Sequence, residues 1–194
     1  MKKTILTLIL AVIAIAPLAA EGTGTGSQNR WQLLAGLSQP IIMHGGNVEI
    51  NYLTKNWVFE YSHGFLLDLN VYSGFTKTAA ERAQGLSITL PYSTGGGIGY
   101  RITEGFNVRA EFKVHRYEVS RGAESFAYTV YSAGVGAYYF WTPLGDHLVI
   151  VPSLRFWPNV ATTLDSGKLI FADGQTHQAH DFGLFANISV GWRF

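Results

Sequence analysis

The sequence predicts an all-β protein, an eight-stranded antiparallel transmembrane β-barrel, and three observations predict it. Apolar and polar side chains alternate along segments of about ten residues, which is the signature of strands that cross a membrane in a barrel. Charged residues make up only 14% of the chain. Short and long connections alternate between the segments, as in barrels with tight periplasmic turns and longer external loops. A soluble sandwich also alternates, but its polar face meets water and carries more Lys and Glu.

The first 20 residues have the layout of a bacterial secretory signal peptide. Lys2 and Lys3 form a positive start, residues 4–16 are almost wholly apolar, and Pro17 precedes small residues that end at Ala20. We therefore assign residues 1–20 to the signal peptide and the other 194 − 20 = 174 residues, 21–194, to one barrel domain. An uncleaved membrane anchor is the alternative, but the apolar run is short for a span.

The composition narrows the classes of function. Export to an oxidising compartment without any cysteine excludes a disulfide scaffold and thiol chemistry. A formal net charge of +1 argues against nucleic acid as a partner. No segment after the signal peptide reaches eighteen apolar residues, so no helical span is expected.

Alternation and turn residues divide the mature chain into eight predicted strands. The last of them shows the pattern clearly, because every second residue from Phe182 to Phe194 is apolar and the residues between are mostly small or polar. The predicted strands cover residues 31–41, 47–53, 57–69, 92–102, 106–118, 126–141, 147–158 and 182–194.

The connections between these strands alternate in length, which places both chain ends on the periplasmic side. Residues 76–85 are expected to form a short helix in one long loop, and residues 165–175 a small hairpin in another. Tryptophans at strand ends fit aromatic girdles at the two membrane interfaces. Trp31, Trp57, Trp141 and Trp192 fall at the periplasmic end, and Trp157 at the other.

The terminal segment "FGLFANISVGWRF" (182–194), which alternates up to a final Phe194, resembles the small eight-stranded outer-membrane barrels of the OmpA, OmpX and OmpW type. The resemblance covers the whole mature chain but assigns no subfamily. It implies a location in the bacterial outer membrane, among outer-membrane lipids and lipopolysaccharide. It also implies that Phe194 is the signal read by the barrel assembly machinery. It says little about activity.

The stretch "NVRAEFKVH" (107–115) gathers ionisable groups on one face of one strand. We expect Val108, Ala110, Phe112 and Val114 to face lipid, because an Arg or Lys on that side at mid-membrane costs roughly 2–4 kcal/mol. The charged side chains then point into the barrel. Neighbouring strands supply room for them through inward glycines, which are Gly95, Gly97 and Gly99 on one side and Gly134 and Gly136 on the other.

The inward charges are expected to form a pairing network, since a buried charge left alone is very costly. We interpret the network as a polar plug, because an eight-stranded barrel is only wide enough for side chains to fill it. A gated ion path or ligand site is the alternative. The predicted lumen residues are Glu49, Glu60, Asp68, Arg101, Arg109, Glu111, Lys113, His115, Arg155 and Arg193.

Two further motifs invite a chemical interpretation. "GGGIG" (95–99) resembles a phosphate-binding loop but lacks the third glycine and the following helix, so we interpret it as barrel wall. "DGQTHQAHD" (173–181) holds two His and two Asp that could bind Zn²⁺. Because the spacing alone is weak evidence, we interpret this segment as a solvated loop and predict no metal site.

His63 is a candidate for chemistry on the outer wall. If its strand keeps its phase, His63 faces lipid, as in outer-membrane lipid A deacylases, which use a His, a Ser and an acidic residue. Ser62 lies on the opposite face, however, and a bulge at Gly64 could turn His63 inward. We therefore predict a non-enzymatic protein with a structural or surface-interaction role and no cofactor. A lipid-modifying enzyme and a narrow channel are the alternatives.

Overall fold

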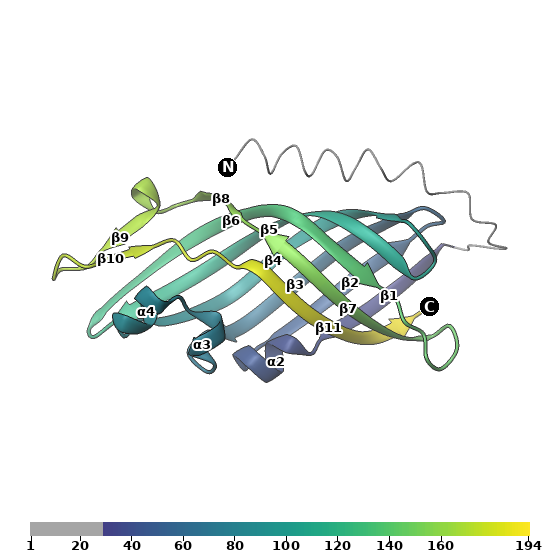
Figure 1. Ribbon diagram of the computed structural model, residues 1–194, viewed down its shortest axis with the longest axis horizontal. Helices are drawn as coiled ribbons and strands as arrows, with labels where there is room; N and C mark the ends of the chain where they lie inside the picture. Colours follow the sequence, from purple (N-terminus) through teal and green to yellow (C-terminus); the bar gives the residue numbers. More distant parts are fainter. Residues whose placement is uncertain (1–28) are drawn as a thin grey trace.

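The computed structural model of the protein describes residues 29–194, so the predicted signal peptide lies outside the described residues. Eight strands form a closed antiparallel barrel, which confirms the predicted fold class. Figure 1 shows them side by side along an elongated molecule. The barrel strands are β1 (Arg30–Gly36), β2 (Gly46–Leu53), β3 (Trp57–Asp68), β4 (Ser87–Arg101), β5 (Phe106–Arg121), β6 (Glu124–Tyr139), β7 (Leu148–Trp157) and β11 (Gly183–Arg193).

Shorter elements connect the barrel strands. The helix expected within 76–85 is present as α4. A hairpin is present near the expected 165–175, but its second strand, β10, lies just beyond that range. The strand β8 follows β7 after Pro158 and pairs only with β6. These elements are α2 (Ser38–Met43), α3 (Ser73–Thr76), α4 (Ala79–Ala83), β8 (Asn159–Thr162), η2 (Asp165–Gly167), β9 (Lys168–Ile170) and β10 (Thr176–Gln178).

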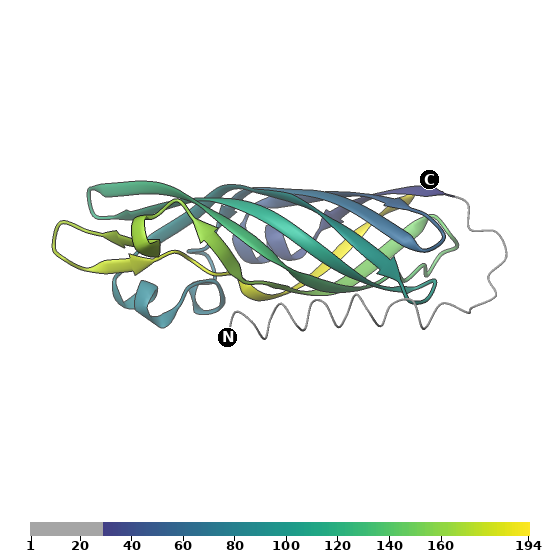
Figure 2. The ribbon, with the colours of Figure 1, turned by 90° about the horizontal axis from the view of Figure 1, so that it is seen from above.

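The sheet closes through the pairing of β1 with β11 and of β5 with β6. The backbone N–H of Phe194 donates to the carbonyl of Trp31 at 2.9 Å, so β1 begins and β11 ends at the same end of the barrel. We call this the terminus end. The opposite end carries α3, α4 and the β9–β10 hairpin, as Figure 2 shows, and we call it the loop end.

The first strand is shorter than the predicted 31–41. It ends at Gly36, and α2 begins at Ser38. Pro40 accounts for the change, because proline cannot donate to a strand ladder but is tolerated in the first turn of a helix. The helix α2 consequently packs against β2, β3 and β11 in place of a longer β1.

The fourth strand begins earlier than the predicted 92–102, at Ser87. Its register against β5 shifts between Thr89 and Tyr92, around Pro91, and such bulges are where a sheet accepts proline. On the adjacent β3, Leu66 has a left-handed φ of 54°. The inward and outward positions of β3 therefore change places after Phe65.

The outer wall of the barrel is apolar, as a membrane-spanning barrel requires. Along β5 the outward Phe112 is 49% exposed, whereas the inward Arg109 is 1% exposed. In the part of the chain that the structure describes, no helix is long and apolar enough to cross a membrane. Large apolar side chains exposed on the strands include Leu33, Ile50, Phe59, Ile98, Phe112, Leu154, Leu184 and Ile188.

Four of the tryptophans lie on the outer wall near the terminus end, where the sequence placed them. Trp31, Trp57, Trp141 and Trp192 are each about half exposed. Trp157 is different, because it points into the barrel and is 7% exposed. The prediction that Trp157 belongs to an aromatic girdle at the opposite membrane interface was therefore wrong. Its position shares the inward phase of β7 with Ser153 and Arg155.

Two apolar clusters occupy the interior. One lies toward the terminus end and contains Leu34, Leu53, Val58, Tyr138, Phe140, Val149 and Val151. The other lies toward the loop end, where the long connections fold over the strands. Its buried members are Met43, Leu67, Leu69, Leu86, Ile88, Leu90, Tyr117, Val119, Tyr128, Val130 and Phe171. Between the clusters the inward side chains are polar or charged.

Candidate functional site: the charged network in the lumen

Six ionisable side chains meet in the middle of the barrel. Three are cations and three are carboxylates, and each is at most 7% exposed. Charges this deeply buried are tolerated when they are paired and hydrogen-bonded. The six, which we call the lumen network, are Arg109, Lys113, Arg155, Glu49, Glu60 and Glu111.

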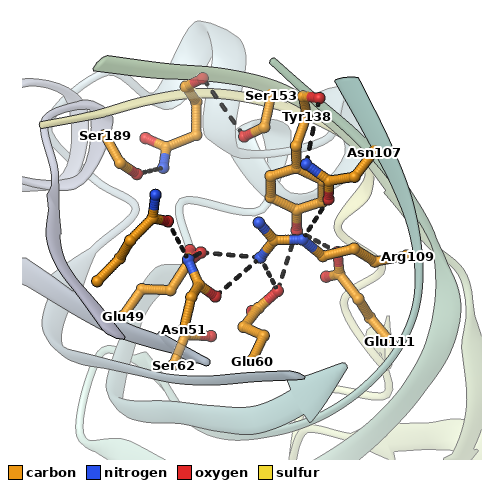
Figure 3. Close-up of polar contacts among 12 residues, drawn as sticks. Glu49, Asn51, Glu60, Ser62, Asn107, Arg109, Glu111, Tyr138, Ser153 and Ser189 are labelled. Carbon is orange, nitrogen blue, oxygen red and sulfur yellow. Dashed lines mark hydrogen bonds and ion pairs between the residues drawn. The ribbon is translucent and has the colours of Figure 1, made fainter. Parts of the chain in front are cut away.

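Arg109 on β5 is the hub of the network. Its Nη1 donates to Glu60 Oε2 at 2.7 Å and to Glu49 Oε1 at 2.9 Å. Its Nε donates to Asn107 Oδ1 at 2.8 Å, and its Cζ lies 3.6 Å from the ring centroid of Tyr138. Figure 3 shows these groups pointing toward one another inside the barrel. One guanidinium therefore links strands β2, β3 and β5 across the lumen.

The carboxylates of β2 and β3 each bridge two cations. Glu60 also accepts a hydrogen bond from Lys113 Nζ at 2.6 Å, and the same Nζ lies 2.6 Å from Ser62 Oγ. Glu49 Oε2 accepts from Arg155 Nη2 at 2.9 Å. Removing either carboxylate would take an ion-pair partner from two cations. Glu49 and Glu60 are therefore the acids with the most ion pairs in the network.

The carboxylate of Glu111 accepts its hydrogen bonds from two aromatic side chains. Trp157 Nε1 donates to Glu111 Oε2 at 2.7 Å, and the hydroxyl of Tyr138 donates to Oε1. Lys113 Nζ lies farther away, at 3.9 Å from Oε2. The sequence reasoning missed Tyr138 and Trp157 as network members. Strand parity could have found both, because each continues the inward phase of a predicted strand.

Small residues flank the long inward side chains of β5. A Cβ added at Gly99 would lie 2.6 Å from Cγ of Arg109, and one added at Gly97 would lie 2.9 Å from Cγ of Glu111. The "GGGIG" segment is part of β4, as its interpretation as barrel wall required. Across the ladders Arg109 lies between Gly99 and Gly136, Glu111 between Gly97 and Gly134, and Lys113 between Gly95 and Ser132.

Three predicted lumen charges lie outside the network: the assignments of Asp68 and Arg101 are corrected here, whereas Arg193 keeps the inward phase of β11 away from the network. Asp68 follows the phase change at Leu66, and its Oδ1 accepts from the backbone N–H of Asn70 at 2.8 Å. Arg101 lies at the end of β4 and donates to the carbonyl of Thr54 at 2.9 Å. Strand ends carry these side chains toward turns and loops instead of the centre.

Arg193 is the third of these residues. It lies near the terminus end, where its Nε and Nη2 each face the side-chain amide of Gln32 at 2.8 Å, and the amide oxygen accepts both hydrogen bonds once its O and N are assigned to satisfy these donors. Its Cζ is 5.7 Å from the ring centroid of Phe140, a member of the apolar cluster at that end. The partner of Arg193 is therefore a neutral amide and not a carboxylate.

His115 marks the boundary between the lumen network and the apolar cluster at the loop end. Its Nδ1 lies 2.8 Å from Ser93 Oγ, and its ring lies 5.0 Å from that of Phe182. Beyond it, the inward face of β5 continues with Tyr117 and Val119, which are fully buried. Phe182 begins the apolar phase of the last predicted strand, but it packs inward ahead of Gly183, whose φ is 54°.

His63 lies on the outer wall, and Gly64 pairs regularly with Ser93, so no bulge turns it inward. Its ring stacks beside those of Phe65 and Tyr92, with centroids 6.4 Å away in both cases. Ser62 points inward and contacts Lys113. Within residues 29–194, His63 has no hydrogen bond to a serine or a carboxylate, and so no catalytic triad is assembled around it.

The two histidines of "DGQTHQAHD" are buried, which corrects their interpretation as part of a solvated loop. His177 is 2% exposed and His180 is 6% exposed, and both face Glu81 of α4. The two aspartates of the motif lie elsewhere, because Asp173 pairs with an arginine and Asp181 accepts from a backbone N–H. Among the described residues, no group of three His, Cys, Asp or Glu side chains is arranged to hold a metal ion.

Comparison with known proteins supports the fold alone. No family model matches the chain, and no curated protein matches it significantly. The N-terminal β-barrel domain of Pseudomonas aeruginosa OprF aligns with a TM-score of 0.50 at 13% identity, over 87% of this chain and 100% of that chain. Neisserial surface protein A aligns with a TM-score of 0.48 at 13% identity, over 85% and 92% of the two chains. Ail of Yersinia pestis aligns with a TM-score of 0.46 at 14% identity, over 86% and 99%.

The closed eight-stranded architecture and its apolar outer wall define the class of this protein. It has the fold of the small eight-stranded outer-membrane β-barrels, as the terminal segment with Phe194 led us to expect. With sequence identity as low as 13%, the shared feature is the barrel itself.

Proposed function

We propose that the protein is a non-conducting barrel of the bacterial outer membrane with a structural or surface-interaction role. The observation that carries this proposal is the order of layers along the barrel axis. The lumen network lies between an apolar cluster at the terminus end and a larger one at the loop end. An ion crossing the barrel would have to leave water and pass both clusters, which is strongly unfavourable.

The location is inferred from the wall and from the chain ends. An apolar outer surface with tryptophans near one interface suits a bilayer. Phe194 directly follows β11, and we propose that the barrel assembly machinery recognises this aromatic residue. In this orientation the terminus end faces the periplasm, and the loop end faces outward among lipopolysaccharide.

The loop end supports a surface role. Its long connections are folded over the barrel and carry exposed apolar side chains, of which Phe75 is 92% exposed and Ile170 is 67% exposed. Loops positioned by a rigid scaffold are where binding residues are concentrated. The external surface therefore offers a partner an ordered face instead of an open pore.

Conductance in planar bilayers tests the proposal. The wild-type protein should give no steady single-channel current, because the lumen network is closed and an apolar cluster lies on each side of it. As a matched pair, Val58→Ser introduces a polar group into the terminus-end cluster, and Val108→Ser changes the outer wall of the same barrel. Large steady currents from the wild type would overturn the proposal and select the narrow channel.

The enzyme alternative has a separate test. Purified protein in bilayers should release no fatty acid from lipid A or phospholipid, since His63 lacks the partners that hydrolysis requires. Turnover that is lost in His63→Ala but kept in His147→Ala would contradict this expectation.

A further inference from the structure

The loop end is closed by two chain segments that are far apart in the sequence. We call residues 69–86 and 163–182 together the cap. Gln84 Nε2 donates to the carbonyl of Thr176 at 3.1 Å, which joins the two segments directly. Leu86 and Phe171, one from each segment, are 1% and 2% exposed in the same apolar cluster. The cap thus covers the apolar cluster of the barrel as one unit.

A polar cluster lies beneath this joint, and its members come from both cap segments and from the barrel wall. Glu81 Oε1 lies 2.9 Å from Nδ1 of His180 and 3.7 Å from Nδ1 of His177. His177 Nε2 lies 2.9 Å from the hydroxyl of Tyr128, and the same hydroxyl oxygen accepts the backbone N–H of His180 at 3.1 Å. All four side chains are at most 6% exposed.

These distances define one consistent set of hydrogen bonds. The hydroxyl oxygen of Tyr128 accepts the backbone N–H of His180, and His177 Nε2 is the acceptor that the described residues offer to the hydroxyl proton, so Tyr128 donates to Nε2. That arrangement requires a neutral His177 with its proton on Nδ1, toward Glu81. Glu81 Oε2 meanwhile accepts the backbone N–H of Thr78 at 2.7 Å, within the capping box of α4.

Adding a proton to His177 breaks this set. Its Nε2 becomes a donor, so the Tyr128 hydroxyl loses the one side-chain acceptor it has within residues 29–194 and keeps a buried, unpaired proton. Among the described residues, the cluster also holds a single carboxylate, which lies closer to His180 than to His177, so an imidazolium on His177 has no carboxylate of its own. A buried charge without its own partner strongly disfavours the closed arrangement.

Within the described part of the chain, the side chains around this polar cluster offer no second carboxylate to pair with a protonated His177. On β5 the cluster faces Tyr117 and His115, and on β6 it faces Tyr128. From the segment between β10 and β11 it faces Phe182 and the exposed Asp181, whose Oδ1 is taken by the backbone N–H of Gly183. On α4 the neighbouring Arg82 points away, toward the carbonyl of Ser73.

We propose that Glu81, His177 and His180 form an acid-released latch that holds the two cap segments together at neutral pH and lets them separate when His177 is protonated. The latch would control exposure of the apolar cluster at the loop end. It is independent of conductance, because the cluster at the terminus end and the lumen network remain in place when the cap opens.

The direction of the pH dependence follows from linkage. Burial lowers the pKa of His177, and the nearby Glu81 only partly offsets this. A released His177 has a pKa of about 6.5 and binds the proton more readily, so the latch loses stability as the pH falls below about 6.5. Burial alone would raise the pKa of Glu81, but hydrogen bonds from His180 and Thr78 outweigh it and hold the pKa at about 2. Glu81 therefore stays charged through the window in which His177 titrates.

Spin-label distances across the cap test the proposal. The chain contains no cysteine, so Gly74→Cys and Gln175→Cys provide two exposed label sites, one in each cap segment. In lipid nanodiscs at pH 7.5, double electron–electron resonance should show one narrow distance distribution. Below pH about 6.5 a second component with longer and broader distances should appear, which represents the open cap. The ratio of open to closed cap should rise by about tenfold for each pH unit, because opening is linked to the binding of one proton.

Matched variants test whether His177 is the residue whose protonation opens the cap. His177→Gln keeps a polar side chain without titration and should remove the pH dependence between 7.5 and 5, whereas His147→Gln, at the terminus end, should keep it. Glu81→Gln preserves the capping-box pattern but removes the carboxylate, so it should raise the pH of opening. Heat-dependent gel mobility reports in each case that the barrel itself is folded.

Three results would overturn the latch. The wild type could keep its narrow distribution down to pH 5, or His177→Gln could open with the same pH dependence as the wild type. Opening at pH 7.5 on addition of EDTA would show that a metal ion, and not the hydrogen-bonded cluster, holds the cap closed.

Discussion

Trp157 donates a hydrogen bond of 2.7 Å from its indole Nε1 to Oε2 of Glu111, and both residues are buried inside the barrel. The contact joins β7 to β5 across the lumen. It gives Glu111 a donor that carries no charge, while the nearest cation, Lys113, stays at 3.9 Å. The three carboxylates of the lumen network are consequently not equivalent, and substitutions at each should differ in cost.

Glu60→Ala should destabilise the barrel more than Glu111→Ala. Removing Glu60 takes one carboxylate partner from both Arg109 and Lys113, and breaking a buried ion pair typically costs about 3–5 kcal/mol. Removing Glu111 mainly leaves the indole of Trp157 unpaired, at about 1–3 kcal/mol, because the hydroxyl of Tyr138 keeps Glu60 Oε2 as an acceptor at 3.4 Å. Urea unfolding in bilayers measures both, with Val108→Leu on the outer wall as a near-neutral control. Equal loss in all three variants would show that the network does not stabilise the fold.

Gly134→Ala should lower the thermal unfolding midpoint. An added Cβ would overlap the backbone carbonyl of Phe156, which cannot move without breaking the approach of β6 to β7. Overpacking of this kind costs about 1–3 kcal/mol. The matched control is Gly74→Ala in α3, where an added Cβ has nothing within 4 Å. If heat-dependent gel mobility gives the same unfolding midpoint for both variants, the close packing of β6 against β7 does not require glycine at position 134.

Single cysteines should separate the two faces of the wall. Ala110 and Ala186 are exposed on the outer wall, whereas Ser132 and Ser189 are each 1% exposed and point inward. All four are small, so replacement by cysteine perturbs the packing little. A fluorophore on the alanine positions should be quenched by nitroxide-labelled lipid, and the serine positions should resist labelling. Similar reaction and quenching at the four sites would remove the membrane-facing assignment.

Deleting Phe194 should lower the yield of assembled barrel without changing synthesis. The last strand pairs with β1 to close the sheet, and we expect its terminal aromatic residue to be read during assembly. Cell fractionation with a heat-modifiability assay measures the assembled fraction. Removal of residues 1–20 provides the matched export control, since that variant should not reach the envelope at all. A fully assembled Phe194 deletion would contradict the proposed signal.

The lumen network shows which features the alternation of side chains along a strand can predict and which it cannot. Alternation placed Arg109, Glu111, Lys113 and His115 on one face and glycines opposite them, because a strand in regular register has a strict period of two. It also placed Glu49, Glu60 and Arg155 inward. It could not say which cation meets which carboxylate, since those pairs cross the lumen between strands that are not neighbours.

Two of the errors follow from places where the period of two breaks. Leu66 takes a left-handed φ, which moved Asp68 off the lumen face and Leu67 onto it. Pro40 ended the first strand early in favour of α2. A single residue with an unusual conformation reverses every face beyond it, and alternation carries no signal for such a residue until the neighbouring strands are known.

The sequence by itself determined the barrel, its strand number, its apolar outer wall and the charged character of its interior. These follow from side-chain periodicity and from the high cost of placing charge against lipid. Only the tertiary structure decided that Glu60 bridges Arg109 and Lys113, and that His177 and His180 are buried against Glu81. Those contacts join residues 49 to 99 positions apart, and chain folding alone brings them within hydrogen-bonding distance.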